Sequence, residues 1–219
     1  MSNTASWLLN NPSVPFPAAR LQNMRKWSHK KLVSILSGED QLSTVSCKRM
    51  RTINLVEHSE RWATDFEKEV GSIKDILSEN LIAAYHIGST AISGLRAKPV
   101  IDILLEVRFL SEVDKRNKRL EELGYEAKGE YGIEGRRFFQ KGGKERTHHI
   151  HVFETGNLEI ERHKLFVEFM NAHPGRVAEY EKLKIELASK YKQEPDKYSE
   201  GKAVFIKDID VEATGWKNS

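Results

Sequence analysis

The sequence lacks any long apolar run, and this excludes a conventional membrane-spanning helix. Its longest apolar stretch, from Val100 to Leu105, carries Asp102 and falls far short of the roughly 20 apolar residues that a span needs. No basic region precedes an apolar segment at the N-terminus, so a secretory signal peptide is not expected. The single cysteine, Cys47, cannot form an internal disulfide. We therefore expect a soluble cytoplasmic protein with no membrane span.

The sequence also has no low-complexity tract and no internal repeat. Its 219 residues are 39% hydrophobic and 9% aromatic, which excludes a wholly disordered or collagen-like chain. A chain of this length is long enough for one full hydrophobic core and short for two.

Charge is distributed unevenly along the chain. Residues 1–52 carry eight basic and two acidic residues, a net charge of +6, whereas the remainder carries 27 basic and 30 acidic residues, a net charge of −3. We therefore divide the chain into a basic N-terminal extension, 1–52, and a main domain, 53–219. The extension is expected to be peripheral. The alternative is that its amphipathic stretch from Leu21 to Leu36 binds an anionic membrane or a nucleic acid.

Hydrophobic spacing predicts the elements of the first half of the main domain. Trp62, Phe66, Val70, Ile73 and Leu77 recur every three or four residues, which indicates a helix that begins near Ser59. Strands are predicted at 81–87 and 99–107, the second buried on both faces because it is almost continuously apolar. A capping box at Ser111 predicts a helix that ends at Gly124.

The second half of the main domain reads as three strands followed by helices. The strands are predicted at 125–130, 136–141 and 147–153, with glycine-rich turns between them. A helix follows with an apolar stripe from Leu165 to Met170, and new helices begin at Pro174 and Pro195. Because several strands surround one helix and a helical tail follows, we expect an α+β (mixed α/β) domain with a mixed sheet.

The stretch that carries chemistry is a Gly-Ser turn followed by a carboxylate on a strand. Gly88, Ser89 and Thr90 leave the 81–87 strand in a turn whose free N–H groups and hydroxyls are suited to phosphate oxygens. Asp102 follows in the middle of the next apolar strand. A carboxylate there is costly unless it is paired, hydrogen-bonded or bound to a metal. The alternative is an ordinary turn and a structural ion pair with Lys98 or an arginine.

The residues 86–103, together with Thr147–Val152 and Tyr198–Ile206, resemble the GrpB family over about residues 53 to 213. Gly88-Ser89 followed by Asp102 also resembles the signature of the nucleotidyltransferase superfamily, the polymerase-beta-like fold. The resemblance implies a nucleotidyltransferase-like mixed sheet with flanking helices. It implies that Asp102 is the catalytic carboxylate and that Lys184 and Lys202, on the C-terminal helices, reach a triphosphate. The alternative for both lysines is an exposed helix face.

One departure from the superfamily pattern is plain. An active nucleotidyltransferase carries Asp-x-Asp on this strand, since alternate residues share a face and bind two metals, but Leu104 stands at the second position here. His149 and His151 alternate on a later strand and, with Asp102, form a candidate metal set for Mg²⁺ or Mn²⁺, or for Zn²⁺ if the histidines are ligands. The alternative is that these histidines hydrogen-bond within the sheet or contact a substrate phosphate.

The leading hypothesis is a protein that binds a nucleotide or another phosphorylated small molecule at Gly88-Ser89. Lys98, next to Asp102, and Arg137 are further candidate anion contacts, although a solvated strand edge explains Arg137 equally well. If the protein is an enzyme, one divalent ion on Asp102 would assist nucleotidyl transfer. The alternative is a non-catalytic nucleotide-binding or regulatory module that has lost the metal pair. Nucleic acid is not an expected partner, because no aromatic and basic stacking platform is evident.

Overall fold

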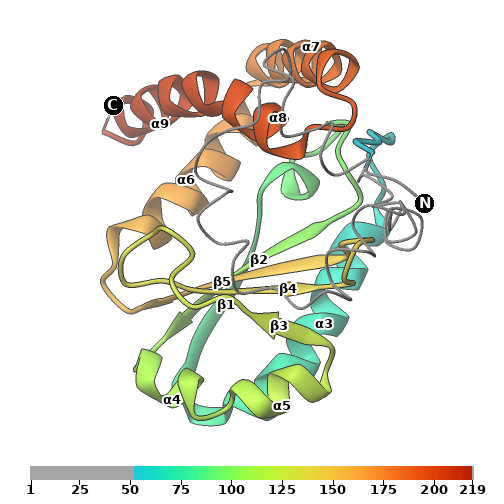
Figure 1. The fold of residues 1–219 in the computed structure, drawn as a ribbon. Coiled ribbons are helices and arrows are strands. Elements are labelled where there is room, and N and C mark those ends of the chain that lie inside the picture. Colours follow the sequence, from blue (N-terminus) through green and yellow to red (C-terminus); the bar gives the residue numbers. More distant parts are fainter. Residues whose placement is uncertain (1–51, 219) are drawn as a thin grey trace, which may run out of the picture. The chain divides into compact units, whose positions relative to one another are not determined.

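The computed structural model describes residues 52–218, which form a five-stranded mixed sheet with helices on both faces (Figure 1). The strand order is β1-β2-β5-β4-β3, with β2 and β5 parallel and the other neighbours antiparallel. The strands are β1 (Leu81–Ile87), β2 (Ile101–Val107), β3 (Tyr125–Ala127), β4 (Arg137–Lys141) and β5 (His148–Glu154). The α+β class and all five predicted strands are confirmed. The predictions for the basic extension, including Cys47, lie outside the described residues.

Different sets of helices cover the two faces of the sheet. In chain order they are α3 (Arg61–Leu77), η4 (Ser78–Asn80), η5 (Ser89–Ala91), α4 (Leu110–Asp114), α5 (Asn117–Glu122), α6 (Leu158–Ala172), α7 (Pro174–Lys190), α8 (Pro195–Gly201) and α9 (Ala203–Lys217). Figure 1 shows α3, α4 and α5 on one side and the C-terminal helices α6, α7, α8 and α9 on the other. None of the helices in residues 52–218 combines the length and apolar character needed to cross a membrane.

The alternation of side chains along β2 decides which residues face which layer. Ile101, Ile103 and Leu105 point toward α3 and join the larger core. Leu104 points to the opposite face, where it packs with Ile160 of α6 and is completely buried. Both faces of β2 are therefore apolar, as its sequence predicts, and Asp102 shares the Leu104 face with the C-terminal helices above it.

The helix predicted from Ser111 to Gly124 is wrong in its start and its continuity. The structure has two short helices, α4 and α5, and Ser111 lies inside the first one. The start of α4 is held from another element, because the backbone N–H of Leu110 donates to Glu154 Oε1 at 2.8 Å. A local sequence pattern does not include a capping carboxylate 44 residues away.

The helix predicted from Pro195 onward is also two helices, α8 and α9, which meet at Lys202. Gly201 comes so close to α7 that an added Cβ would lie 2.5 Å from Leu187 Cδ2. This close approach brings α8 against α7. The break also sets Lys202 at the start of α9, where it faces the β2 side of the molecule.

Candidate functional site

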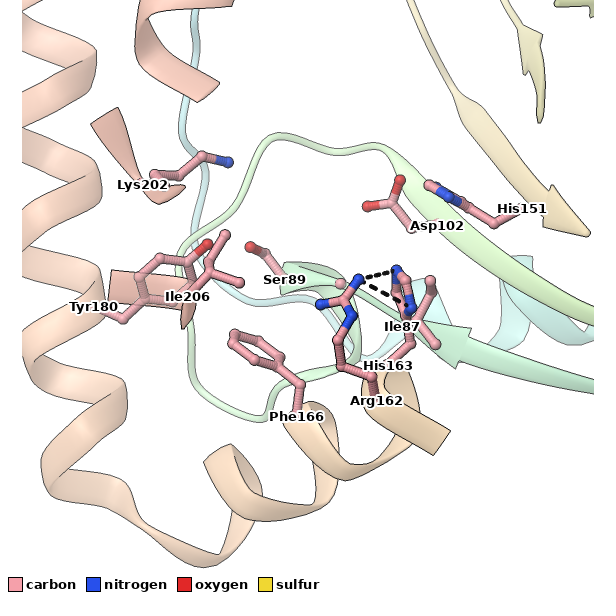
Figure 2. Close-up of a pocket in the computed structure, with 11 residues that line it drawn as sticks. Ile87, Ser89, Asp102, His151, Arg162, His163, Phe166, Tyr180, Lys202 and Ile206 are labelled. Atoms are coloured by element: carbon pink, nitrogen blue, oxygen red, sulfur yellow. Dashed lines mark hydrogen bonds between the residues drawn. The ribbon is translucent and has the colours of Figure 1, made fainter. Parts of the chain in front are cut away.

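A cavity of about 270 Å³ lies between the sheet and the C-terminal helices (Figure 2). The sheet side supplies Gly88, Ser89, Asp102 and His151, and the helices supply an apolar and basic wall. Figure 2 shows Asp102 and His151 on one side of the cavity and Lys202 on the other. The complete lining consists of Ile87, Gly88, Ser89, Asp102, His151, Arg162, His163, Phe166, Tyr180, Lys202 and Ile206.

The Gly-Ser turn sits directly against the carboxylate of β2. Gly88 has φ +71°, a left-handed conformation, and η5 begins immediately after it. A Cβ at Gly88 would lie 2.5 Å from Asp102 Oδ2. Only a glycine therefore allows the backbone to approach this carboxylate so closely, and the register that pairs Ile87 with Asp102 holds the two together.

Thr90 supports this turn and does not line the cavity. It is buried, its hydroxyl donates to the Val100 carbonyl at 3.3 Å, and it lies 2.9 Å from His86 Nε2. Thr90, which the sequence predicted as a phosphate contact, therefore uses its hydroxyl for hydrogen bonds that hold the loop.

The loop after the turn is attached to the C-terminal helices. The side-chain amide of Asn171, on α6, accepts from Ser93 N at 2.9 Å and donates to Ala91 O at 3.2 Å. Lys184, on α7, donates to the Arg96 carbonyl, while Glu181 accepts from the Arg96 N–H at 3.2 Å. Ile92 and Leu95 are fully buried in the core of these helices. The position of the Gly-Ser turn therefore depends on α6 and α7.

Asp102 is hydrogen-bonded to His149, its partner on the parallel strand β5. The distance from His149 Nδ1 to Asp102 Oδ1 is 2.9 Å. Burial raises the pKa of Asp102, but the hydrogen bond from His149 and the nearby charges, Lys202 among them, outweigh burial, and the net pKa lies below its usual value. Asp102 is therefore a carboxylate, and His149 Nδ1 donates the proton in this bond.

His151 points to the same face of β5 as His149 and is neutral. Burial lowers the pKa of His151 to about 3. Its Nδ1 lies 3.4 Å from Nη1 of Arg136, which can only donate, so the proton of the ring is on Nε2. Arg136 is itself buried and donates to the backbone carbonyl of Tyr131 at 2.7 Å.

Three lysines surround two buried tyrosines beside the cavity. The ammonium groups of Lys98 and Lys202 lie 5.0 and 4.7 Å from the ring centroid of Tyr198, and that of Lys184 lies 5.2 Å from the ring of Tyr180. Lys184 is only 1% exposed. Burial, together with the charge of Lys202, lowers the pKa of Lys184 to about 7. Burial and the charge of Lys98 lower the pKa of Lys202 to about 8. Lys184 is buried, Lys98 and Lys202 are half-buried, and the three ammonium groups lie beside the same pair of tyrosines.

The structure brings most of the predicted residues together and leaves one apart. Gly88, Ser89, Asp102, His151 and Lys202 line the cavity. His149 is hydrogen-bonded to Asp102. Lys98 and Lys184 lie behind the cavity, where their ammonium groups face the rings of Tyr198 and Tyr180. Arg137 does not line the cavity, because its guanidinium forms a two-pronged ion pair with Asp114 at 2.7 and 2.9 Å.

Sequence reasoning did not assign a site role to Tyr180, Phe166 or Arg162. Burial raises the pKa of Tyr180 to about 12, and a hydrogen bond with Ser89 opposes that rise. Tyr180 and Lys184 are four residues apart on α7, so a helical wheel places them on one face. Phe166 and Arg162 have the same spacing on α6. That spacing is the only local signal, and nothing in it distinguishes a cavity wall from a core stripe.

The donor set around Asp102 does not fit the predicted metal centre. One carboxylate oxygen already accepts the proton of His149, and the second position of Asp-x-Asp is the buried Leu104. Within residues 52–218, no group of three His, Cys, Asp or Glu side chains is arranged to hold a metal ion.

Comparison with known proteins assigns the chain to a family. The GrpB protein family matches residues 52–212, nearly all of the part that contains the cavity. The chain belongs to the GrpB family. A crystal structure of the conserved protein GrpB from Enterococcus faecalis is 38% identical with a TM-score of 0.73, covering 76% of this chain and 100% of that one.

Two curated GrpB relatives give the extent of the likeness. The UPF0157 protein YqkA of Bacillus subtilis is 42% identical over 167 residues, which cover 76% of this chain and 49% of YqkA. The glutamate-rich protein GrpB of Alkalihalophilus pseudofirmus is 38% identical over 160 residues, covering 71% of this chain and 92% of that protein. The chain thus spans about half the length of YqkA. The wider relationship to nucleotidyltransferases stays a prediction.

Proposed function

We propose that this GrpB protein binds a phosphorylated small molecule, with a nucleotide as the class that the superfamily resemblance implies. The observation that carries the proposal is the group of three lysines beside the cavity, with Lys202 in its wall and the buried Lys184 behind it. Ammonium groups that lower one another's pKa favour a bound anion, because its negative charge offsets their mutual repulsion. Ser89 and the turn N–H groups are the hydrogen-bond donors on the opposite side.

Binding is better supported than nucleotidyl transfer. The lysines and the Gly-Ser turn suit phosphate oxygens, whereas the two-metal route needs a second carboxylate where Leu104 stands. Nucleotidyl transfer assisted by one divalent ion on Asp102 is the alternative, and it is disfavoured because one oxygen of that carboxylate already accepts from His149. We also propose that the protein is cytoplasmic and that nucleic acid is not its partner.

The test is titration of pyrophosphate and ATP by calorimetry, first with a chelator and then with Mg²⁺. We expect binding with the chelator present, and we expect Lys202→Gln to weaken it by about tenfold or more, since a charged hydrogen bond is lost. Lys182→Gln, an exposed lysine on the same helix as Lys184, is the matched control and should bind normally. If neither pyrophosphate nor ATP binds, whether with the chelator or with Mg²⁺, the proposal is refuted.

The substitution Asp102→Asn distinguishes ligand binding without a metal from binding that a divalent ion on Asp102 mediates. If the ligand binds without a metal, removal of a negative charge from the cavity should tighten pyrophosphate binding several-fold. If a divalent ion on Asp102 mediates binding, the same substitution should abolish the Mg²⁺-dependent part of the affinity. Circular dichroism of the variant checks that loss of the His149 bond leaves the fold intact.

A further inference from the structure

Arg136 is a buried arginine that lies against His151, one of the residues that line the cavity. It comes immediately before β4, and the register of β4 with β5 pairs Phe138 with His151. Arg136 is 6% exposed, and its guanidinium lies over the Phe138 ring, 4.9 Å from the centroid. The centroids of the Phe138 and His151 rings are 5.0 Å apart. Phe138 therefore packs against both the guanidinium and the imidazole.

The charge of Arg136 has no carboxylate partner among residues 52–218. Its Nε donates to the Glu130 carbonyl at 3.1 Å, its Nη2 donates to the Tyr131 carbonyl at 2.7 Å, and its Nη1 lies 3.4 Å from His151 Nδ1. A buried cation without an ion pair is costly, and burial lowers the pKa of Arg136 accordingly. Arg136 does not line the cavity, whereas His151 does, so His151 stands between this charge and the cavity.

His151 presents its Nε2–H group to the cavity. The other tautomer, with the proton on Nδ1, would direct an N–H group at a guanidinium that has only donors. Among the described residues Nε2 has no hydrogen-bond partner, and it is not one of their buried unpartnered atoms, so it is open to the cavity. Asp102 lies in the same wall, but its carboxylate accepts from His149. His151 is therefore a neutral donor that faces the cavity with an arginine behind it.

We infer that His151 donates a hydrogen bond from Nε2 to the anionic group of the ligand, and that Arg136 is the positioning residue that fixes this tautomer. The bond from Arg136 to Nδ1 also polarises the ring, which makes Nε2–H a stronger donor. The inference rests on the proposed function, because an anion must bind in the cavity. It adds a second contact on the sheet side, across the cavity from Lys202 (Figure 2).

The first measurement reads the tautomer of His151 in the full chain by long-range proton–nitrogen NMR, which distinguishes a protonated from an unprotonated ring nitrogen. The His151 signals are identified by their absence in His151→Gln. We expect the wild type to carry the proton on Nε2 alone and Arg136→Met to show both tautomers. Arg137→Met is the matched control, because the adjacent Arg137 pairs with Asp114 and does not line the cavity. It should leave the tautomer unchanged.

The second measurement is calorimetric titration of pyrophosphate with a chelator present. His151→Phe and Arg136→Met should each weaken binding by about tenfold, since a hydrogen bond to a charged group is lost or misdirected. His151→Gln keeps an N–H donor and should retain most of the affinity. Adding Arg136→Met to His151→Phe should cause little further loss, because Arg136 acts through the imidazole. Arg137→Met should bind normally.

The outcomes separate the inference from the proposed function. If the wild type binds no pyrophosphate, the proposed function fails and the inference fails with it. If pyrophosphate binds His151→Phe as tightly as the wild type, anion binding stands and the inference is overturned. A proton on Nδ1 in the wild type also overturns it, whether or not Arg136→Met folds. If Arg136→Met weakens binding equally with and without His151, Arg136 acts by its charge alone and its positioning role is refuted.

Discussion

At the scale of single residues, Gly88 carries the tightest constraint in the cavity. A side chain at position 88 would be disfavoured twice, by the left-handed φ of +71° and by the clash with Asp102. Gly94 shares the left-handed φ but has no such clash. Gly94 has φ +72° and no atom within 4 Å of an added Cβ. We expect Gly94→Ala to lower the free energy of unfolding by about 1–2 kcal/mol, the left-handed cost alone.

Gly88→Ala should cost more, by about 1–3 kcal/mol beyond its control, because Asp102 must shift off its bond with His149. Urea unfolding of the two variants measures the difference. The same shift should weaken anion binding in Gly88→Ala and leave it unchanged in Gly94→Ala. Equal losses of stability in both variants would contradict the close approach of the turn to Asp102.

Lys184 gives a prediction about pH. Its pKa is about 7 in the folded protein, below the ordinary value of 10.5, because burial disfavours the ammonium. Between these two values the unfolded chain binds more protons than the folded one, so stability rises with pH. Lys184→Met removes this contribution. We expect the wild type to gain stability relative to Lys184→Met as the pH rises from about 7 toward 10, measured by urea unfolding.

Anion affinity should move in the opposite direction with pH. Sulfate keeps a constant charge over this range, whereas Lys184 and Lys202, with pKa values of about 7 and 8, lose theirs. Sulfate binding should therefore weaken as the pH rises from about 6 to 9, and less so in Lys184→Met. Parallel stability profiles and pH-independent sulfate binding in both proteins would show that Lys184 titrates in the ordinary range.

At the scale of elements, α6 acts on the Gly-Ser loop through one amide. Asn171 makes two hydrogen bonds to the backbone of the loop, so we expect Asn171→Ala to lower stability by about 1–2 kcal/mol. It should also weaken pyrophosphate binding, because the turn at Ser89 loses its support.

The opposite end of the same helix provides the control. Asn157 caps α6 by accepting from Glu159 N at 2.9 Å, and Asn157→Ala should cost about 1 kcal/mol without a change in affinity. Thermal unfolding and calorimetry of both variants test the difference. Equal affinities at comparable stability would mean that α6 does not position the loop.

At the scale of the whole molecule, the division near residue 52 remains a prediction. The GrpB match begins at residue 52, and the strands and helices that form the cavity all lie after it. We expect residues 50–219 to melt within a few degrees of the full chain and to bind pyrophosphate equally well. A drop of more than about 8 °C, well above the roughly 2–4 °C per kcal/mol expected at this size, would show that the N-terminal segment is integral.

Local patterns determined much of this protein. The period of the apolar residues is a property of consecutive side chains, so it predicted α3, all five strands and the start of α7 at Pro174. Gly88-Ser89 was predicted at the end of one strand and Asp102 on the next, and the antiparallel register of β1 and β2 brings them into contact. These features need only adjacent residues or the next strand.

Only the tertiary structure decided the remaining features, because their causes are distant in sequence. The start of α4 depends on Glu154, and the break before α9 lies where Gly201 meets Leu187. Arg137 is bound by Asp114. Tyr180 reaches the cavity, and Lys184 lies behind it, only because α7 packs on the loop after Ser89. A charged or aromatic side chain has many possible partners along a sequence. Packing decides which of them it contacts, because a polar group that is removed from water must find a partner.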